Sequence, residues 1–180
     1  MKKIIIVGAG GHSKTCIEVV ESSKNYKIIG FIDNKAKLKG IFKNFKIFNE
    51  KNLNALLKIT KNAHIGVGQI KSAKLRIQLF EKYKKKGFKF PVLIHSSAYI
   101  SKYSSVDEGT LVGINSIINA NCIIGYNTII NNKSLIEHDS IIGNNCHIST
   151  GAIINGNCLI GDNTFIGSGS IISNNISIGK

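Results

Sequence analysis

The chain has 180 residues, no tryptophan, one proline and 43% hydrophobic residues, which is typical of a soluble globular protein of one large or two small domains. No apolar run is long enough to span a bilayer, and the apolar stretch after Lys2 and Lys3 is too short for a signal-peptide core. The net charge of +14 is uneven, because residues 1–93 carry 21 Lys and Arg against 5 Asp and Glu, whereas residues 94–180 carry 3 against 5.

These properties predict a cytoplasmic protein that has neither a membrane nor a nucleic acid as its partner. A basic half can bind nucleic acid, but these lysines are scattered and lack interleaved aromatic residues. The pattern favours a solvated, lysine-rich surface. A pocket for a small molecule that carries phosphate is the second interpretation.

The first 90 residues alternate between short apolar runs and helical patterns. We expect strands at residues 2–7, 26–33 and 63–68, and helices at residues 14–23, 52–60 and 70–86. Much of the apolar face of the last helix is formed by Leu75, Ile77, Leu79, Phe80 and Tyr83. Strands that alternate with helices predict a parallel sheet, and hence a small Rossmann-like domain over residues 1–90.

A glycine-rich turn follows the first strand and opens the first helix. Its sequence Gly8-Ala9-Gly10-Gly11-His12-Ser13 approaches the dinucleotide fingerprint, but serine stands at the third glycine position. Asp33, at the end of the second strand, lies where an acid would bind a ribose. Bare backbone at a helix N-terminus favours a phosphate, and the short domain suits a nucleotide sugar better than NAD. A tight turn without any ligand is the alternative.

A six-residue repeat fills the second half of the chain. Ile or Val occupies every sixth position from Ile94 to Ile178, and a small residue follows each of them four positions later from Ala98 to Ser170. A hexapeptide period is the signature of a parallel β-helix, in which the aliphatic residue points inward and the small residue fits a corner. The fifteen hexads predict about five coils of three, over residues 91–180.

The residue before each inward aliphatic residue should point outward, yet many of these are apolar. They are Ile117, Ile123, Ile129, Leu135, Ile141, Ile153, Leu159, Phe165 and Ile171. A solitary prism would expose them as a large apolar patch. We therefore expect prisms to pack side by side as a homo-oligomer, with a homotrimer as the natural closure of a triangular prism.

The four cysteines include no CxxC pair, and three of them, Cys122, Cys146 and Cys158, stand in the column of small corner residues. Residues 18 apart should stack on one edge, which leaves Cys122 and Cys158 roughly 10 Å apart and too far for a disulfide. We interpret them as buried fillers in a reducing compartment.

Two histidines interrupt the repeat. His138 lies between Glu137 and Asp139, and a carboxylate beside an imidazole can orient it as a general base. His147 stands in an outer position that is otherwise apolar. A surface or interface histidine is the alternative for both. The zinc-binding β-helix enzymes that resemble a γ-type carbonic anhydrase use two histidines five apart, and this chain has no such pair, so we expect no metal site.

Together these features resemble the bacterial sugar acyltransferases that join a Rossmann-like domain to a left-handed β-helix. This family includes sialic acid O-acetyltransferases and UDP-4-amino-sugar N-acetyltransferases. The resemblance covers essentially all 180 residues. Its carriers are the turn at 8–13, Gly30-Phe31-Ile32-Asp33, Gly66-Val67-Gly68, Leu93-Ile94-His95-Ser96-Ser97-Ala98 and Leu135-Ile136-Glu137-His138-Asp139.

The resemblance implies a role for particular residues. His138 corresponds to the catalytic base and Asp139 to the acid that tunes it. Acetyl-CoA, the co-substrate, would contact His147, Gly156 and Ser168, and the backbone N–H of Gly156 would serve the thioester carbonyl. The repeat supports this, because Gly156 lies 18 residues after His138. The residues that correspond to acceptor-sugar contacts are Gly10, Gly11, His12, Asp33, Asn34 and Gly68.

The resemblance implies an acetyl-CoA-dependent N-acetyltransferase that acts on a UDP-linked 4-amino sugar in bacterial surface glycan synthesis, without a bound cofactor. O-acetylation of free or CMP-linked sialic acid is the first alternative. Family members usually continue for a further coil and a tail beyond the position of Lys180, where one more acetyl-CoA contact is expected. A truncated trimer that binds a sugar nucleotide without catalysis is therefore the second alternative, and an NAD-dependent oxidoreductase is the least favoured.

Overall fold

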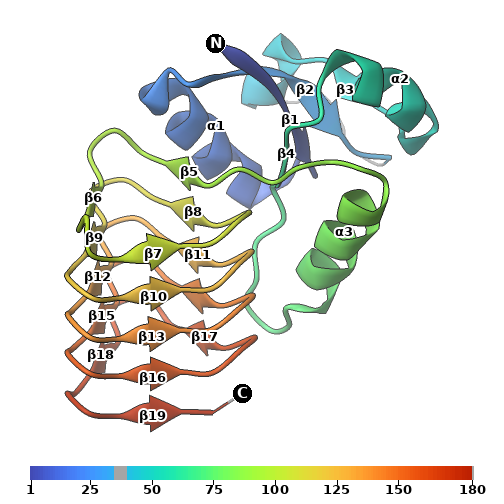
Figure 1. The fold of residues 1–180 in the computed structure, drawn as a ribbon. Coiled ribbons are helices and arrows are strands. Elements are labelled where there is room, and N and C mark those ends of the chain that lie inside the picture. The colour runs from blue at the N-terminus through green and yellow to red at the C-terminus, as the bar shows by residue number, and fades with distance from the viewer. Residues whose placement is uncertain (35–39, 180) are drawn as a thin grey trace. The chain divides into compact units, whose positions relative to one another are not determined.

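The computed structural model describes residues 1–34 and 40–179, which form two compact units (Figure 1). The first unit comprises Met1–Gly68 and Lys74–Pro91. The second comprises Gln69–Ala73 and the chain from Val92 onward. The five residues Gln69–Ala73 therefore belong with the repeat, although they precede a helix of the first unit in the sequence.

The first unit is built on a four-stranded parallel sheet in the order β3-β2-β1-β4. Its strands are β1 (Lys2–Val7), β2 (Tyr26–Ile32), β3 (Ile47–Phe48) and β4 (Ala63–Ile65). Successive side chains of a strand point to opposite faces, and Ile4, Ile5 and Ile6 of β1 are all fully buried, so both faces of the sheet are covered. The strand order is that of half a Rossmann fold, which confirms the predicted Rossmann-like domain.

Three α-helices accompany the sheet in the described part of the chain. They are α1 (Gly11–Ser23), α2 (Leu53–Ile59) and α3 (Lys74–Lys85), and the 3₁₀-helices η1 (Gly40–Asn44) and η2 (Glu50–Asn52) lie between β2 and α2. α1 begins three residues earlier than expected, because the glycine-rich turn itself supplies its first turn. α3 begins at Lys74 rather than at residue 70, since the preceding residues leave the first unit.

Gly30 allows β2 to pair with two neighbours at once. The register between β1 and β2 shifts beside it, and its φ of 149° is a conformation that side chains rarely adopt. A Cβ added here would lie 2.4 Å from the carbonyl oxygen of Lys46, so only glycine fits. The close approach lets β2 continue to Ile32 and deliver Asp33 to the carboxyl end of the sheet.

The second unit is a left-handed parallel β-helix whose three sides are five-stranded parallel sheets. One side contains β5 (Leu93–Ile94), β8 (Leu111–Val112), β11 (Ile129–Ile130), β14 (His147–Ile148) and β17 (Phe165–Ile166). The next contains β6 (Tyr99–Ile100), β9 (Ile117–Ile118), β12 (Leu135–Ile136), β15 (Ile153–Ile154) and β18 (Ile171–Ile172). The third contains β7 (Ser105–Val106), β10 (Ile123–Ile124), β13 (Ile141–Ile142), β16 (Leu159–Ile160) and β19 (Ser177–Ile178).

The register confirms the predicted coil of 18 residues. Leu111 pairs with Ile129, which pairs with His147, which pairs with Phe165. The inward aliphatic residues form one core, and Ile118, Ile136 and Ile154 in its centre are fully buried. The strands visibly stack from β5 to β19 in Figure 1.

The corners between the sides explain the many asparagines. Every sixth residue from Gly109 to Asn175 has a positive φ, and asparagine occupies most of these positions. Asparagine tolerates this left-handed conformation better than most side chains do. Stacked corner amides also bond between coils, as in the 2.8 Å contact from Asn127 Nδ2 to Asn145 Oδ1.

The small corner residues do more than save space. The hydroxyl of Thr128 donates to the carbonyl oxygen of Gly143, at 3.0 Å, and accepts the N–H of Cys146, also at 3.0 Å. The thiol of Cys146 takes the same place one coil later, 3.1 Å from the carbonyl oxygen of Gly161. The three corner cysteines are buried and free, as predicted, and each is a weak donor to the backbone.

The outward apolar residues divide by side. On the two sides that contain β9 and β10, Ile117, Ile123, Ile141, Leu159 and Ile171 are between 39% and 66% exposed in the single chain. On the side that contains β11, Ile129 is fully buried, so the prediction that it lies exposed is wrong. This column also holds Leu111, which is buried too.

Candidate active site

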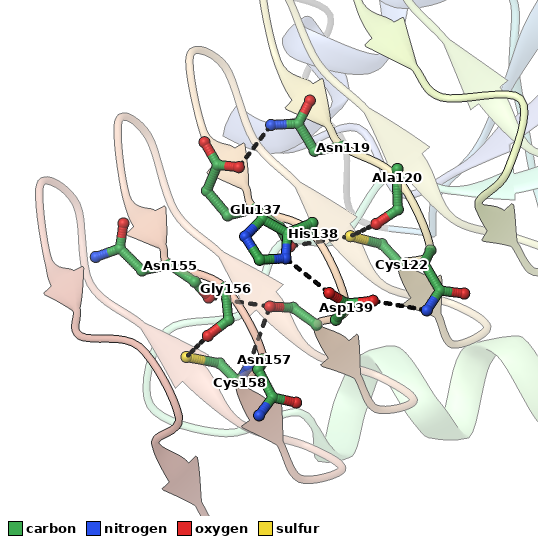
Figure 2. A network of polar contacts seen from close by, with 12 residues as sticks. Asn119, Ala120, Cys122, Glu137, His138, Asp139, Asn155, Gly156, Asn157 and Cys158 are labelled. Carbon is green, nitrogen blue, oxygen red and sulfur yellow. Dashed lines mark hydrogen bonds and ion pairs between the residues drawn. The ribbon is translucent and has the colours of Figure 1, made fainter.

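His138 and Asp139 lie side by side at a corner between β12 and β13. The Nδ1 atom of His138 is 2.7 Å from Oδ2 of Asp139, and both side chains are about half exposed. The contact is seen in Figure 2, with the imidazole lying between the coils of Asn119 and Asn155. With Nδ1–H donating to the carboxylate, the opposite atom Nε2 has a free lone pair, which is the arrangement of a general base.

The corner conformation orients the carboxylate. Asp139 has a φ of 62° and occupies the column in which Asn121, Asn157 and Asn175 stand at other coils. Asn121 Nδ2 donates to Asp139 Oδ1 at 2.7 Å, so the carboxylate is held from both sides. The hydrogen bonds from Asn121 and His138 lower the pKa of Asp139, which is therefore ionised from neutral pH down to acidic pH.

Gly156 lies against the imidazole one coil later, as the 18-residue spacing predicted. A Cβ added at Gly156 would stand 2.8 Å from both Cε1 and Nε2 of His138, so glycine leaves the imidazole room to hold its present position. At the corners of Ile114, Tyr126 and Asn144, the equivalent N–H donates to a side chain one coil on. The N–H of Gly156 donates to none of the residues the structure describes.

His147 is held inside the second unit rather than on its surface. The residue is 6% exposed, and its ring lies edge-on to that of Phe165 with the centroids 5.3 Å apart. Nδ1 is 2.6 Å from the carbonyl oxygen of Gln69, and Nε2 is 3.1 Å from Nδ2 of Asn131. The carbonyl requires a donor and the amide requires an acceptor, which assigns the proton of the neutral ring to Nδ1.

Ser168 is exposed, and its hydroxyl lies 2.9 Å from that of Ser149 on the coil before. His147 lies on the side of the prism that contains β14 and β17, and Ser168 lies at the corner that follows β17. His138 and Gly156 belong to the corner after β12 and β15. The repeat therefore brings the pairs together in two groups, on different corners of the coil.

The glycine-rich turn of the first unit presents open backbone at the start of α1. Gly10 precedes the helix, no side chain caps it, and a Cβ added at Gly10 or Gly11 would contact nothing within 4 Å. The carboxylate of Asp33 accepts the N–H of Ala9 at 3.0 Å and so fixes the turn from the end of β2. Unused N–H groups at a helix N-terminus form a favourable place for an anion.

A cavity of about 260 Å³ opens beside this turn at the carboxyl ends of β1 and β2. Its polar wall contains Asp33, Asn34 and Glu50, and most of the rest is aliphatic. Among the described residues, no lysine or arginine lines this cavity. Lys82 Nζ lies 2.7 Å from Oε1 of Glu50. The hydrogen bonds from Lys82 and Tyr83 lower the pKa of the Glu50 carboxyl.

The remaining predicted acceptor contacts, His12 and Gly68, lie next to each other. His12 is half-buried on α1, and a Cβ added at Gly68 would stand 3.2 Å from its Cβ. Two further residues, Arg76 and Gln69, were not predicted from the sequence. Arg76 is fully buried on α3, and Gln69 anchors the segment before α3 to the repeat, through Nε2 to the carbonyl oxygen of Asn163 at 3.2 Å. A single arginine in the apolar pattern of α3 was the available signal for the first.

The described residues contain no group of three or more His, Cys, Asp and Glu side chains that could hold a metal ion. None of their helices has the length and apolar character needed to cross a membrane.

The chain is similar to known families and to solved structures. Residues 3–83 match the PglD N-terminal domain family, and residues 88–180, more than half of the chain, match the GMPPB C-terminal domain family. The acetyltransferase domain of PglB from Neisseria gonorrhoeae FA1090, in complex with acetyl coenzyme A, is 27% identical with a TM-score of 0.88, over 99% of this chain and 85% of that one. The chain belongs to the GMPPB C-terminal domain family and to the bacterial hexapeptide-repeat sugar acetyltransferases.

The same fold recurs in a more distant protein. A mutant of perosamine N-acetyltransferase from Caulobacter crescentus, in complex with CoA and GDP-perosamine, is 23% identical with a TM-score of 0.81, over 98% of this acetyltransferase and 91% of that chain. Comparison with curated protein sequences gives no match for this acetyltransferase.

Proposed function

We propose that this acetyltransferase moves the acetyl group of acetyl-CoA onto the amino group of a nucleotide-linked amino sugar. The single observation that carries the proposal is the exposed His138–Asp139 pair with Gly156 against its ring. The complexes of the similar proteins support the two substrates, namely acetyl coenzyme A in the PglB domain and GDP-perosamine in the Caulobacter enzyme.

The chemistry needs one base and one donor to an oxyanion. The acceptor amine attacks the thioester carbon, and His138 Nε2 takes the proton that the nitrogen loses as the C–N bond forms. Asp139 holds the imidazole and stabilises its protonated form. The unused N–H of Gly156 would stabilise the negative charge on the thioester oxygen, after which the C–S bond breaks and the CoA sulfur receives the proton from His138.

The first unit would bind the nucleotide. The N–H groups of Gly10 and Gly11 at the start of α1 suit a diphosphate, whereas the aliphatic cavity beside them suits a base. Asp33 and Asn34 line this cavity and are the proposed ribose and base contacts. His12 and Gly68 remain proposed contacts of the sugar.

The contacts to acetyl-CoA are proposed on the second unit. Ser168 is exposed and can offer its hydroxyl, which Ser149 supports at 2.9 Å. Both ring nitrogens of His147 are hydrogen-bonded, so its proposed contribution to acetyl-CoA binding is to hold Asn131 and the backbone of Gln69 in place.

Assembly as a homotrimer belongs to the same proposal. Five aliphatic residues stand exposed on two sides of the prism, an arrangement that favours prisms packed side by side. The four buried, free cysteines suit the reducing cytoplasm, where acetyl-CoA is available.

Release of free thiol from acetyl-CoA tests the proposal and identifies the acceptor. Parallel reactions would contain a UDP-linked 4-amino sugar, GDP-perosamine, or free and CMP-linked sialic acid. Thiol release with one of the two amino sugars supports N-acetylation, and the choice between UDP and GDP names the nucleotide. Release with sialic acid alone would overturn the proposal in favour of O-acetylation. Silence with every acceptor, from a folded protein that binds UDP, would favour a binding protein without catalysis.

Replacement of His138 tests the assignment of the base. His138→Ala should lower kcat about 10²–10⁴-fold, as loss of a general base does. The matched control is His95→Ala. The Nδ1 atom of His95 contacts the hydroxyl and the N–H of Ser97, and among the described residues it has no carboxylate partner such as Asp139. Full turnover by His138→Ala would show that another group takes the proton.

A further inference from the structure

Arg76 is the largest fully buried side chain in the described part of the chain, at 1% exposure. It lies on α3 among apolar residues, such as Phe80 and Tyr83, that pack the helix onto the sheet. A buried guanidinium is costly unless hydrogen bonds compensate it, and burial lowers the pKa of Arg76 to about 10, so it remains charged at neutral pH. Such a residue calls for an explanation beyond packing.

The guanidinium bonds to two carbonyl groups of one short segment. Nη1 donates to the carbonyl oxygen of Ile65 at 2.7 Å and to that of Val67 at 2.9 Å. Ile65 is the last residue of β4, and Val67 is the centre of the segment Gly66-Val67-Gly68 that follows it. Arg76 therefore sets the path of the chain as it leaves the sheet.

That segment packs directly beneath the glycine-rich turn. The N–H of Gly66 donates to the carbonyl oxygen of Val7 at 2.8 Å, and Ser13 Oγ lies 2.7 Å from the carbonyl oxygen of Gly8 and 3.0 Å from that of Gly66. A Cβ added at Gly8 would stand 2.8 Å from Cγ2 of Val67. A shift of this segment would therefore displace the glycine-rich turn.

The same segment forms the wall of the ligand site. Val67 lines the cavity at the carboxyl ends of β1 and β2, and Gly68 lies against His12. His64, one residue before the end of β4, is also fully buried, and neither of its ring nitrogens has a hydrogen-bond partner among the described residues. The polar contacts from α3 to this stretch of chain therefore come from Arg76, through the carbonyl groups of Ile65 and Val67.

We propose that Arg76 is a positioning residue for the nucleotide-sugar site, which holds Gly66-Val67-Gly68 against the glycine-rich turn through the carbonyl groups of Ile65 and Val67. This inference rests on the proposed function for the identity of the ligand. An apolar residue at position 76 would spare the cost of burying a charge, but it would leave both carbonyl groups without their donor.

Ligand binding by the whole chain is the first test, with UDP as the probe. Arg76→Met should weaken UDP binding about 10-fold or more, since each lost bond from a charged donor costs a large part of that factor. The KM for the nucleotide sugar should rise with it, while kcat and the affinity for acetyl-CoA change little. Arg76→Lys should recover part of the UDP affinity, because an ammonium can still donate to the carbonyl groups.

Phe80→Leu is the matched control on the same helix face. Phe80 packs on Phe90 with the ring centroids 4.6 Å apart and does not line the cavity, so its replacement should lower the melting temperature without weakening UDP binding. If Arg76→Met weakens UDP binding no more than Phe80→Leu does, Arg76 merely stabilises the fold and the proposal is wrong.

Amide hydrogen exchange tests the positioning without any ligand, and so stays decisive if the wild type binds no UDP and the proposed function fails. In Arg76→Met, the N–H of Gly66 should lose protection while the amides of Ile5 and Ile6 in β1 keep theirs. Arg76→Gln replaces this variant if the methionine protein does not fold. Unchanged protection at Gly66, or an equal loss throughout β1, would overturn the proposal.

Discussion

At position 139 an aspartate occupies a corner that asparagine fills at positions 121, 157 and 175. The backbone needs a residue that tolerates positive φ, and both side chains meet that need. Their difference is chemical, because the carboxylate is charged and accepts from both Asn121 and His138. Asp139 can therefore orient the proposed base while it keeps the backbone conformation that asparagine has at the equivalent corners.

Asp139→Asn separates the charge from the corner. The amide should restore the kind of ladder seen between Asn157 and Asn175, so the midpoint of thermal unfolding should change little, as for most surface substitutions. We expect kcat to fall, by less than the about 10²–10⁴-fold expected for loss of His138 itself. Steady-state kinetics and thermal unfolding measure the two, and an unchanged kcat would remove Asp139 from the mechanism.

Gly156→Ala tests the space beside the imidazole. The new Cβ would stand 2.8 Å from His138 Nε2, so the ring must turn away from its present position. We expect a lower kcat with little change in the KM for either substrate. Gly179→Ala is the control, because a Cβ there meets nothing within 4 Å. A fully active Gly156→Ala protein would show that the ring position is not critical.

At the scale of elements, β4 shows how tertiary packing changes the meaning of a side chain. In sequence, His64 lies in an apolar stretch and could be taken for a surface residue of a short strand. In the structure it is fully buried, and burial lowers its pKa well below the usual value, with the nearby charge of Arg76 as the second cause. The folded first unit therefore holds His64 in its neutral form.

This burial predicts a loss of stability in acid. Below about pH 6.5 the unfolded chain binds a proton at His64 that the folded chain does not, so stability is complete above that pH and falls with decreasing pH by up to about 1.4 kcal/mol per unit. The fall continues until the lowered pKa of the folded state is reached. Urea unfolding at pH 7.5 and 5.5 would measure it.

His64→Leu provides the comparison, because leucine fills a similar space without a titratable group. The difference in unfolding free energy between the two pH values should be smaller in His64→Leu than in the wild type. Equal acid sensitivity of both proteins would assign the loss to other groups.

At the scale of the whole molecule, the two prism sides with exposed aliphatic residues carry the proposed assembly. Ile141→Asp should separate a trimer into single chains, since it places a charge in what would become an apolar interface. Lys133→Asp is the control, because it introduces the same carboxylate at an exposed corner that already has positive φ. Light scattering after size exclusion gives the mass of each. A wild-type protein that elutes as a single chain would refute the trimer.

The sequence alone determined the β-helix and its register. A period of six with two columns in phase admits one arrangement, since a slip would turn Ile118 or Ile136 outward and a small residue into the core. The same period placed Gly156 one coil from His138. The order of strands and helices in the first unit also follows from local patterns, because alternation and turn residues are local properties. The same patterns place the glycine-rich turn and Asp33 at the carboxyl ends of the first two strands.

Only the tertiary structure decided which side chains are buried and what they hold. Ile129 and Ile123 occupy the same outer position of the repeat, yet Ile129 is buried and Ile123 is exposed, because the difference lies in what covers each side. A helix pattern alone predicts a solvated charge at Arg76. In the structure, its guanidinium donates to the carbonyl groups of Val67 and Ile65, nine and eleven residues earlier in the chain. Periodicity describes one element at a time, whereas burial and hydrogen bonding depend on the elements that pack against it.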